Sequence, residues 1–308
     1  MSVLAGRRSP GHLGEAVVHF NRALDAMASA SSTVEVARAL FDGLNKIQTE
    51  WLFDQTDQRI SEVRGFQSMI RDGLQSEARD AFLQGQELQS FALLQPQIMN
   101  HDTLRRHRYR PDAEIDPSLV RDAQEEHKKL VTAYRELQAS GNPDIEDRVL
   151  KRATELLYVV RSNIAHGEKT LYGPDTKKRE RDETVCSVVV PLQRILFDLL
   201  LERPSRRLVA YGTLAPGQAN HQVVAGLSGN WETCTLRGSI EPSRDLPVFS
   251  WNPGGMELDA HLFTSSQLPN SWARIDAFEG EAYKRRLVPA RTETGIAIAN
   301  VYLASRNR

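Results

Sequence analysis

The sequence has few of the features that mark secreted or membrane proteins. It contains two cysteines, Cys186 and Cys234, which lie far apart in the chain and are too few for a disulfide framework. No run approaches the roughly 18 apolar residues of a membrane-spanning helix, and residues 1–20 lack the apolar core of a signal peptide. We therefore expect a cytoplasmic protein with no membrane contact.

An excess charge of one sign and the common cofactor motifs are also missing. The formal net charge is -1, so no global field attracts nucleic acid, and RNA contact requires a local patch. There is no glycine-rich phosphate loop, no Gly-x-Ser-x-Gly elbow and no paired-histidine zinc motif. These absences predict no nucleotide cofactor and no metal ion.

Two kinds of periodicity divide the 308 residues. Residues 14–201 mostly carry apolar side chains at helical spacing. After Pro204 the pattern changes to strands separated by turns. We predict a multi-domain protein, with an all-α helical bundle at residues 1–202, a linker at 203–207 and a small α+β barrel at 208–308.

The clearest helix is predicted between the capping pair Asn142-Pro143 and Gly167, a typical residue just past a helix end. Its buried stripe consists of Ile145, Val149, Ala153, Leu156, Val160 and Ile164. Arg161 and His166 lie near its end, about 140° apart around the axis at about 100° per residue. They cannot easily share a pocket on one helix, but they could meet across a groove formed with the following loop, a neighbouring helix or a second copy of the chain.

This helix carries the motif Tyr158-x-x-Arg161-x-Asn163-x-x-His166-Gly167. With the charged loop and apolar helix that follow, residues 120–202 resemble the HEPN superfamily. The resemblance implies a helical homodimer in which two Arg/His pairs line one cleft and, in many members, metal-independent RNA cleavage. An imidazole moves the proton of a ribose 2′-hydroxyl while a guanidinium holds the phosphorane charge. Arg161 and His166 are thus catalytic candidates and Asn163 a substrate-binding candidate; the alternative is that the first two are polar flanks of a packed helix.

A second candidate RNA contact lies at residues 101–111, where positive charges surround an aromatic side chain. Its candidates for phosphate binding and base stacking are Arg105, Arg106, Arg108 and Tyr109. Short basic runs also occur on ordinary solvated surfaces, so both interpretations stay open.

The C-terminal segment has the pattern of strands and turns. We expect strands at residues 208–211 and 257–263, a hairpin of 286–291 with 296–303, and one short helix at 271–278. These elements predict a compact α+β unit, a small barrel.

Three motifs follow one another there: Tyr211-Gly212-Thr213-Leu214, Ile275-Asp276-Ala277-Phe278-Glu279-Gly280 and Tyr283-x-Arg285-x-x-Val288. In this order they make residues 206–305 similar to the gamma-glutamylcyclotransferase-like family. The resemblance implies that Glu279 is the catalytic acid/base and that Tyr211–Leu214 and Tyr283 bind a small γ-glutamyl substrate. Intramolecular cyclisation to 5-oxoproline needs little more than positioning, one carboxylate and oxyanion donors. The alternative interpretation is that Glu279 is an ordinary exposed acid before a helix-capping glycine.

The sequence supports three functional hypotheses. In the first, the helical domain is an endoribonuclease or RNA-binding module linked to a C-terminal domain that controls it, as in a toxin or phage-defence system. In the second, a cyclotransferase releases 5-oxoproline and the helices only dimerise it. In the third, the protein is a binding or assembly module without catalysis. Loss of RNA cleavage on changing Arg161 or His166, or of 5-oxoproline release on changing Glu279, separates the three.

Overall fold

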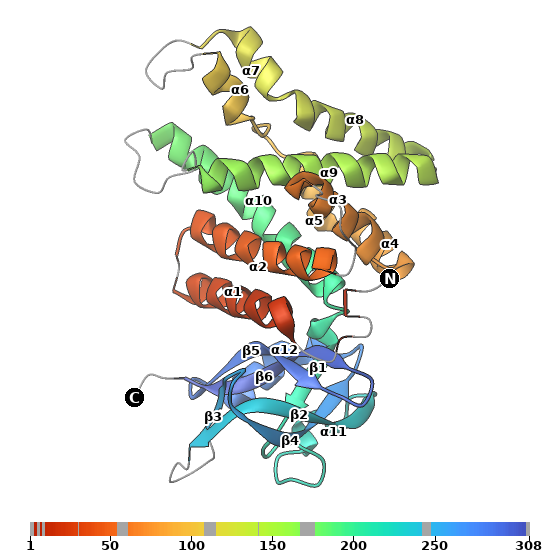
Figure 1. Cartoon of the computed structure of the whole chain (residues 1–308), viewed down its shortest axis with the longest axis vertical. Coiled ribbons are helices and arrows are strands. Elements are labelled where there is room, and N and C mark those ends of the chain that lie inside the picture. The colour runs from red at the N-terminus through yellow and green to blue at the C-terminus, as the bar shows by residue number, and fades with distance from the viewer. Residues whose placement is uncertain are drawn as a thin grey trace. The chain divides into compact units, whose positions relative to one another are not determined.

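A computed structural model describes residues 3–4, 7, 10–29, 31–53, 61–107, 115–140, 142–166, 176–241 and 248–305. The chain has a helical N-terminal part followed by a C-terminal barrel (Figure 1). Contacts divide it into two compact units, one formed by Arg22–Leu199 and the other by Leu200–Arg308 together with Ser2–Asn21. The first helix therefore begins in one unit and ends in the other.

The N-terminal part is built from α-helices. Their bounds are α1 Gly11–Ala28, α2 Thr33–Phe53, α3 Glu62–Gly73, α4 Ser76–Leu83, α5 Gln86–Ala92, α6 His101–Arg106, α7 Pro117–Ala123, α8 Glu125–Ser140, α9 Pro143–Ala165 and α10 Thr176–Leu200. Within the described ranges, no helix is long and apolar enough to cross a membrane.

Helix α9 packs against α2, α3 and α8. It begins as the sequence predicts, because the side chain of Asn142 accepts a hydrogen bond from the N–H of Asp144 (3.0 Å) and Pro143 occupies the first turn. Its predicted apolar stripe, from Ile145 to Ile164, is buried. Helical spacing of apolar residues was therefore enough to identify the face that packs into the core.

The charged run at Lys177–Glu183 was expected in a loop, and this prediction was wrong because it forms the first turns of α10. Lysine, arginine and glutamate are good helix formers, and the run contains no glycine or proline. Glu183 also caps α2, since its carboxylate accepts hydrogen bonds from the Ser32 hydroxyl and from the Thr33 hydroxyl and N–H. Pro191 lies inside α10.

His127 is fully buried on α8 and joins two backbone segments of the helical unit. Its Nδ1 accepts a hydrogen bond from the N–H of Ile98 (2.8 Å), so its Nε2 carries the proton and donates to the carbonyl of Ala92 (3.0 Å). Burial lowers the pKa of the His127 imidazole. The neutral ring thus ties residues 92–98 to α8.

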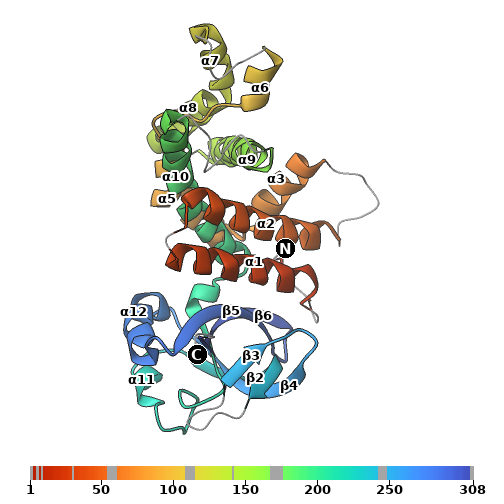
Figure 2. The same ribbon diagram turned by 90° about the vertical axis from the view of Figure 1, so that its left-hand side faces the viewer.

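The C-terminal unit is a five-strand barrel. Its elements are the 3-10 helix η1 Pro204–Arg206, strands β1 Arg207–Ala210, β2 Asn230–Glu241, β3 Val248–Trp251, β4 Met256–Thr264, β5 Tyr283–Arg291 and β6 Ile296–Ala304, and helices α11 Gln222–Ala225 and α12 Leu268–Glu279. The strands run in the order β2-β4-β1-β6-β5, and pairing of Thr235 with Arg291 closes the ring. Strand β3 pairs with β2 outside the ring. Figure 2 shows this ring with α11 and α12 beside each other, where Arg274 donates to the carbonyl of Val223 (2.7 Å).

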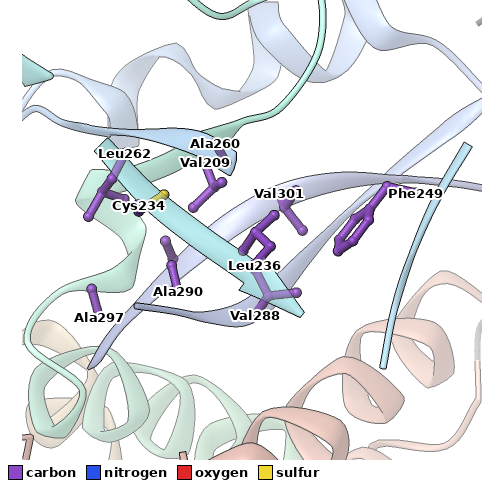
Figure 3. Close-up of a cluster of buried hydrophobic side chains, with 11 residues drawn as sticks. Val209, Cys234, Leu236, Phe249, Ala260, Leu262, Val288, Ala290, Ala297 and Val301 are labelled. Carbon is purple, nitrogen blue, oxygen red and sulfur yellow. The ribbon is translucent and has the colours of Figure 1, made fainter. Parts of the chain in front are cut away.

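Apolar side chains from the strands fill the barrel interior (Figure 3). Labelled members include Val209 from β1, Leu236 from β2, Val288 from β5 and Val301 from β6. Cys234 lies among them, and burial raises the pKa of its thiol to about 12. The interior of the barrel is therefore a packed core.

Most local predictions for this unit are confirmed. The hairpin is β5 with β6, and the short helix is α12, each a few residues longer than expected. Strands β2 and β3 were not predicted. In β2 the buried side chains of Cys234 and Leu236 alternate with the more exposed Thr233, Thr235 and Arg237, but the exposed Glu232 lies on the same face as Cys234, so the alternation is short.

An N-terminal segment contributes to this unit. The N–H of Ile296 donates to the carbonyl of Arg7 (3.0 Å), while Asn21 donates to the carbonyl of Leu287 and accepts from its N–H (2.9 Å each). Gly295 has a φ of +143°, and a Cβ there would lie 2.6 Å from the carbonyl oxygen of Arg7. The sequence assigned residues 1–202 to one helical domain, but these contacts group Ser2–Asn21 with the barrel.

Candidate functional site

A pocket opens where β1 ends. It has about 530 Å³ of empty space, part of it open to solvent. Its lining residues are Val209, Ala210, Tyr211, Gly212, Thr213, Leu214, Glu279, Tyr283 and Tyr302. All the residues that the cyclotransferase resemblance nominated for substrate contact and catalysis therefore line one pocket.

The loop after β1 forms one wall. The carbonyl of Gly212 accepts from the N–H of Ala215 (3.0 Å), that of Thr213 from the N–H of Asn220 (3.0 Å), and that of Leu214 from Nδ1 of His221 (3.2 Å). The N–H groups of residues 212–214 have no such partner in the described part of the chain. A loop whose carbonyl groups are already hydrogen-bonded and whose N–H groups are free can donate hydrogen bonds to a ligand.

Glycine at position 212 leaves this wall open. A Cβ built there would meet nothing within 4 Å, and the backbone is compatible with a side chain. The fold therefore does not require glycine at this position. A ligand that approaches the loop backbone closely would require it.

Glu279 also lines the pocket, and among the described residues that line it, Glu279 is the one with a carboxylate. It is the last residue of α12, and Gly280 turns the chain away with a φ of +63° and a ψ of -163°, a conformation that glycine adopts readily. Burial raises the pKa of the Glu279 carboxyl. Its place at a helix C-terminus acts in the same direction, because the helix dipole there disfavours negative charge.

Three tyrosines complete the pocket. The Tyr211 hydroxyl donates to the main-chain carbonyl of Tyr302 (2.9 Å), and its ring packs on Phe249 with centroids 5.1 Å apart. The Tyr302 hydroxyl donates to Oδ1 of Asp276 (2.7 Å). Burial raises the pKa of all three phenols, and the Glu279 carboxylate adds to this for each of them. These phenols are therefore neutral donors, which leaves Glu279 as the lining side chain suited to proton exchange near neutrality.

Residues 208–308 match the family described as gamma-glutamyl cyclotransferase, AIG2-like. This confirms the family that the three motifs predicted for the C-terminal region. The match covers the barrel only, so the HEPN resemblance of residues 120–202 stays a prediction.

Three solved structures with some likeness to the chain each match about a third of it. YkqA from Bacillus subtilis is 24% identical over 32% of this chain and 36% of its own, with a TM-score of 0.29. An uncharacterized protein from Pyrococcus horikoshii is 25% identical over 33% and 80% of the two chains, with a TM-score of 0.26. An AIG2-like protein from Mus musculus is 16% identical over 33% and 79%, with a TM-score of 0.28. No curated protein sequence matches the chain.

In the helical unit, Arg161 and His166 have different surroundings. Arg161 donates to the carboxylate of Glu62 (3.0 Å) and to the hydroxyl of Tyr158 (3.3 Å), and its guanidinium lies 5.2 Å from the centre of the Tyr158 ring. His166 is exposed at the end of α9, where its N–H donates to the carbonyl of Ser162 (2.9 Å). The guanidinium is thus engaged by a carboxylate of the same unit.

The remaining RNA candidates have structural contacts or fall outside the described ranges. Asn163 is buried and donates to the carbonyl of Met99 (2.9 Å). Arg105 and Arg106 are exposed on α6, and each contacts Asp102. Arg108, Tyr109 and Gly167 lie outside the described residues.

Sequence reasoning missed two residues of the pocket region. Tyr302 lines the pocket from the last strand, and no motif marks it. Asp276 was part of a motif, but its bond to Tyr302 depends on α12 lying against β6. The available signal for Asp276 was its place one helical turn before Glu279.

Proposed function

We propose that the barrel is a γ-glutamyl cyclotransferase that releases 5-oxoproline from a small γ-glutamyl compound. The observation that carries this proposal is the pairing of Glu279, a partly buried carboxylate with a raised pKa, with the free amides of the Tyr211–Leu214 loop in one pocket. The family match of residues 208–308 supports the same chemistry.

The reaction is an internal amide exchange. The α-amine of the glutamyl group attacks its own γ-carbonyl carbon, a new C–N bond closes a five-membered ring, and the carbonyl oxygen takes up negative charge. The amide C–N bond then breaks, and the leaving amine takes a proton. Glu279 accepts the proton of the attacking amine and delivers it to the leaving nitrogen, so no water or cofactor is consumed.

The pocket lowers the barrier in two ways. Amides of residues 212–214 donate to the developing oxyanion, an interaction that strengthens as charge forms. The tyrosine walls hold the glutamyl chain folded, so that its amine lies near its own carbonyl. A carboxyl whose pKa is raised towards neutrality can take and return a proton in the same turnover.

The test is release of 5-oxoproline from a panel of γ-glutamyl amines, measured by mass spectrometry on the full-length protein. Glu279→Gln is expected to lower kcat by about a hundredfold or more, because it removes the proton acceptor while keeping the size of the side chain. Glu281→Gln, an exposed neighbour outside the pocket, is the matched control and keeps full activity. Equal loss in both variants, or turnover that survives Glu279→Gln, contradicts the proposal.

The helical unit carries the second hypothesis, metal-independent RNA cleavage by Arg161 and His166 in a homodimer. Because Arg161 is held by Glu62, the described contacts favour the pocket as the site of catalysis. Incubation of the full-length protein with RNA in EDTA decides the matter. Cleavage that disappears in both Arg161→Ala and His166→Ala supports the nuclease, whereas the absence of such cleavage leaves the helices as a dimerisation or assembly module.

A further inference from the structure

We propose that Arg285 and Asp276 form a positioning clamp that holds Glu279 ready for proton transfer, although neither residue lines the pocket. This inference rests on the proposed function of the pocket. It adds two residues of β5 and α12 that act through Glu279, and it explains why an arginine follows Tyr283 at this spacing.

The clamp fixes the helix that carries Glu279. Nε of Arg285 donates to Oδ1 of Asp276 (2.9 Å) and Nη2 donates to Oδ2 (3.1 Å), a bidentate pair. The same guanidinium lies 4.4 Å from the centre of the Trp272 ring. Trp272 and Asp276 are one turn apart on α12, and Glu279 is the next residue along this side of the helix. Arg285 therefore holds α12 at two successive turns.

The clamp also reaches the pocket wall. Oδ1 of Asp276 accepts from the Tyr302 hydroxyl (2.7 Å) as well as from Arg285, and Nη1 of Arg285 donates to the side chain of Asn300 on β6 (3.4 Å). The Tyr302 carbonyl in turn accepts from the hydroxyl of Tyr211 (2.9 Å). One carboxylate thus connects Arg285 with the tyrosines that face Glu279.

The charge of Arg285 has a separate effect. Asp276 lies three residues before Glu279, so an unbalanced Asp276 carboxylate would disfavour ionisation of Glu279. Among the described residues that line the pocket with Glu279, the titratable groups are the phenols of Tyr211, Tyr283 and Tyr302, whose raised pKa keeps them neutral. Arg285 balances the Asp276 carboxylate through two hydrogen bonds, so its removal is expected to affect the ionisation of Glu279 as well as its position.

The experiment uses the full-length protein labelled with 13C at the glutamate carboxyl, with Glu279→Gln to assign the resonance. In Arg285→Gln the pKa of Glu279 is expected to rise by about half a unit or more, and kcat to fall about tenfold with a smaller change in KM. The acid limb of the kcat profile moves to higher pH by the same amount. Lys284→Gln, which removes the same charge from an exposed site on the same strand, changes neither.

Two further variants separate position from charge. Arg285→Lys keeps the charge but not the bidentate geometry, so the Glu279 pKa stays at the wild-type value while kcat falls. In the double variant Asp276→Asn/Arg285→Gln both charges are gone, and the Glu279 pKa returns to the wild-type value. Thermal unfolding monitored on each variant reports whether the barrel is intact.

A Glu279 pKa in Arg285→Gln equal to the wild-type pKa overturns the inference, as does a double variant whose pKa stays high. If Arg285→Gln is unfolded at the assay temperature, the Glu279 pKa is compared between Arg285→Lys and the double variant instead. The titration needs no turnover, so the two proposals can fail separately. If no γ-glutamyl compound is turned over but the pKa shifts as expected, the clamp stands and the cyclotransferase proposal falls.

Discussion

A methyl group added at Gly212 tests the pocket without disturbing the fold. The Cβ of Gly212→Ala would meet no atom within 4 Å, and the backbone already has a conformation that alanine adopts. The free energy of unfolding should therefore change by no more than about 1 kcal/mol, with stabilisation expected because alanine reduces the freedom of the unfolded chain. The methyl group occupies space beside the free amides of residues 212–214, where the substrate carbonyl is proposed to lie.

The effect on catalysis should be much larger than the effect on stability. Displacing the reacting carbonyl by about 1 Å from its donors is expected to lower kcat/KM about a hundredfold. Release of 5-oxoproline and denaturant unfolding are measured on the same preparation. Gly226→Ala is the matched control, since its Cβ also meets nothing within 4 Å, but the residue ends α11 outside the pocket.

Either of two results refutes this reasoning. Full activity in Gly212→Ala shows that the substrate does not approach the loop backbone. A loss of more than about 1 kcal/mol in unfolding free energy shows that the space around position 212 is needed by the fold itself. If Gly226→Ala loses as much activity as Gly212→Ala, the loss in Gly212→Ala is not specific to the pocket.

Two further predictions concern stability. Gly280→Ala should lower the unfolding free energy of the barrel by about 1–3 kcal/mol. The added Cβ meets no atom within 4 Å, so the loss comes from the backbone φ of +63°, which alanine adopts only with strain. An unfolding midpoint equal to that of Gly226→Ala contradicts this prediction. Burial lowers the folded-state pKa of His127, so below a pH of about 6.5 the unfolded chain binds a proton that the folded chain does not, and stability falls as the pH decreases. Denaturant midpoints at pH 7.5 and 5.5 measure the loss, which His127→Gln should reduce; the same pH dependence in that variant assigns it to other groups.

Local patterns in the sequence predicted many of the elements. Apolar residues at helical spacing identified α9 and its buried face, and the capping pair Asn142-Pro143 marked its start. Alternation identified the β5–β6 hairpin, and the three motifs identified the family of residues 208–308. Each of these patterns depends on a few neighbouring residues, so it can be recognised in a single sequence.

The sequence patterns failed to predict helices and strands where the local preference of the residues and the tertiary packing disagree. The run Lys177–Glu183 has no apolar stripe and looks like a loop, but its helix is supported by contacts such as that of Glu183 with Thr33 on α2. Strand β2 alternates weakly, and it exists because β4 and β3 pair with it on either side. Such support comes from residues far away in the chain, which periodicity cannot detect.

The sequence by itself determined which residues of the barrel are candidates for the proposed chemistry, because Tyr211–Leu214 and Glu279 each belong to a recognisable local motif. Only the tertiary structure decided that they line the same pocket, because parallel pairing of β1 with β6 and closure of the ring bring these distant segments together. It also decided the state of Glu279, since the burial that raises the pKa of its carboxyl is a property of the packed site and not of the motif. Short motifs specify chemical groups, whereas distance, desolvation and charge balance depend on the whole fold.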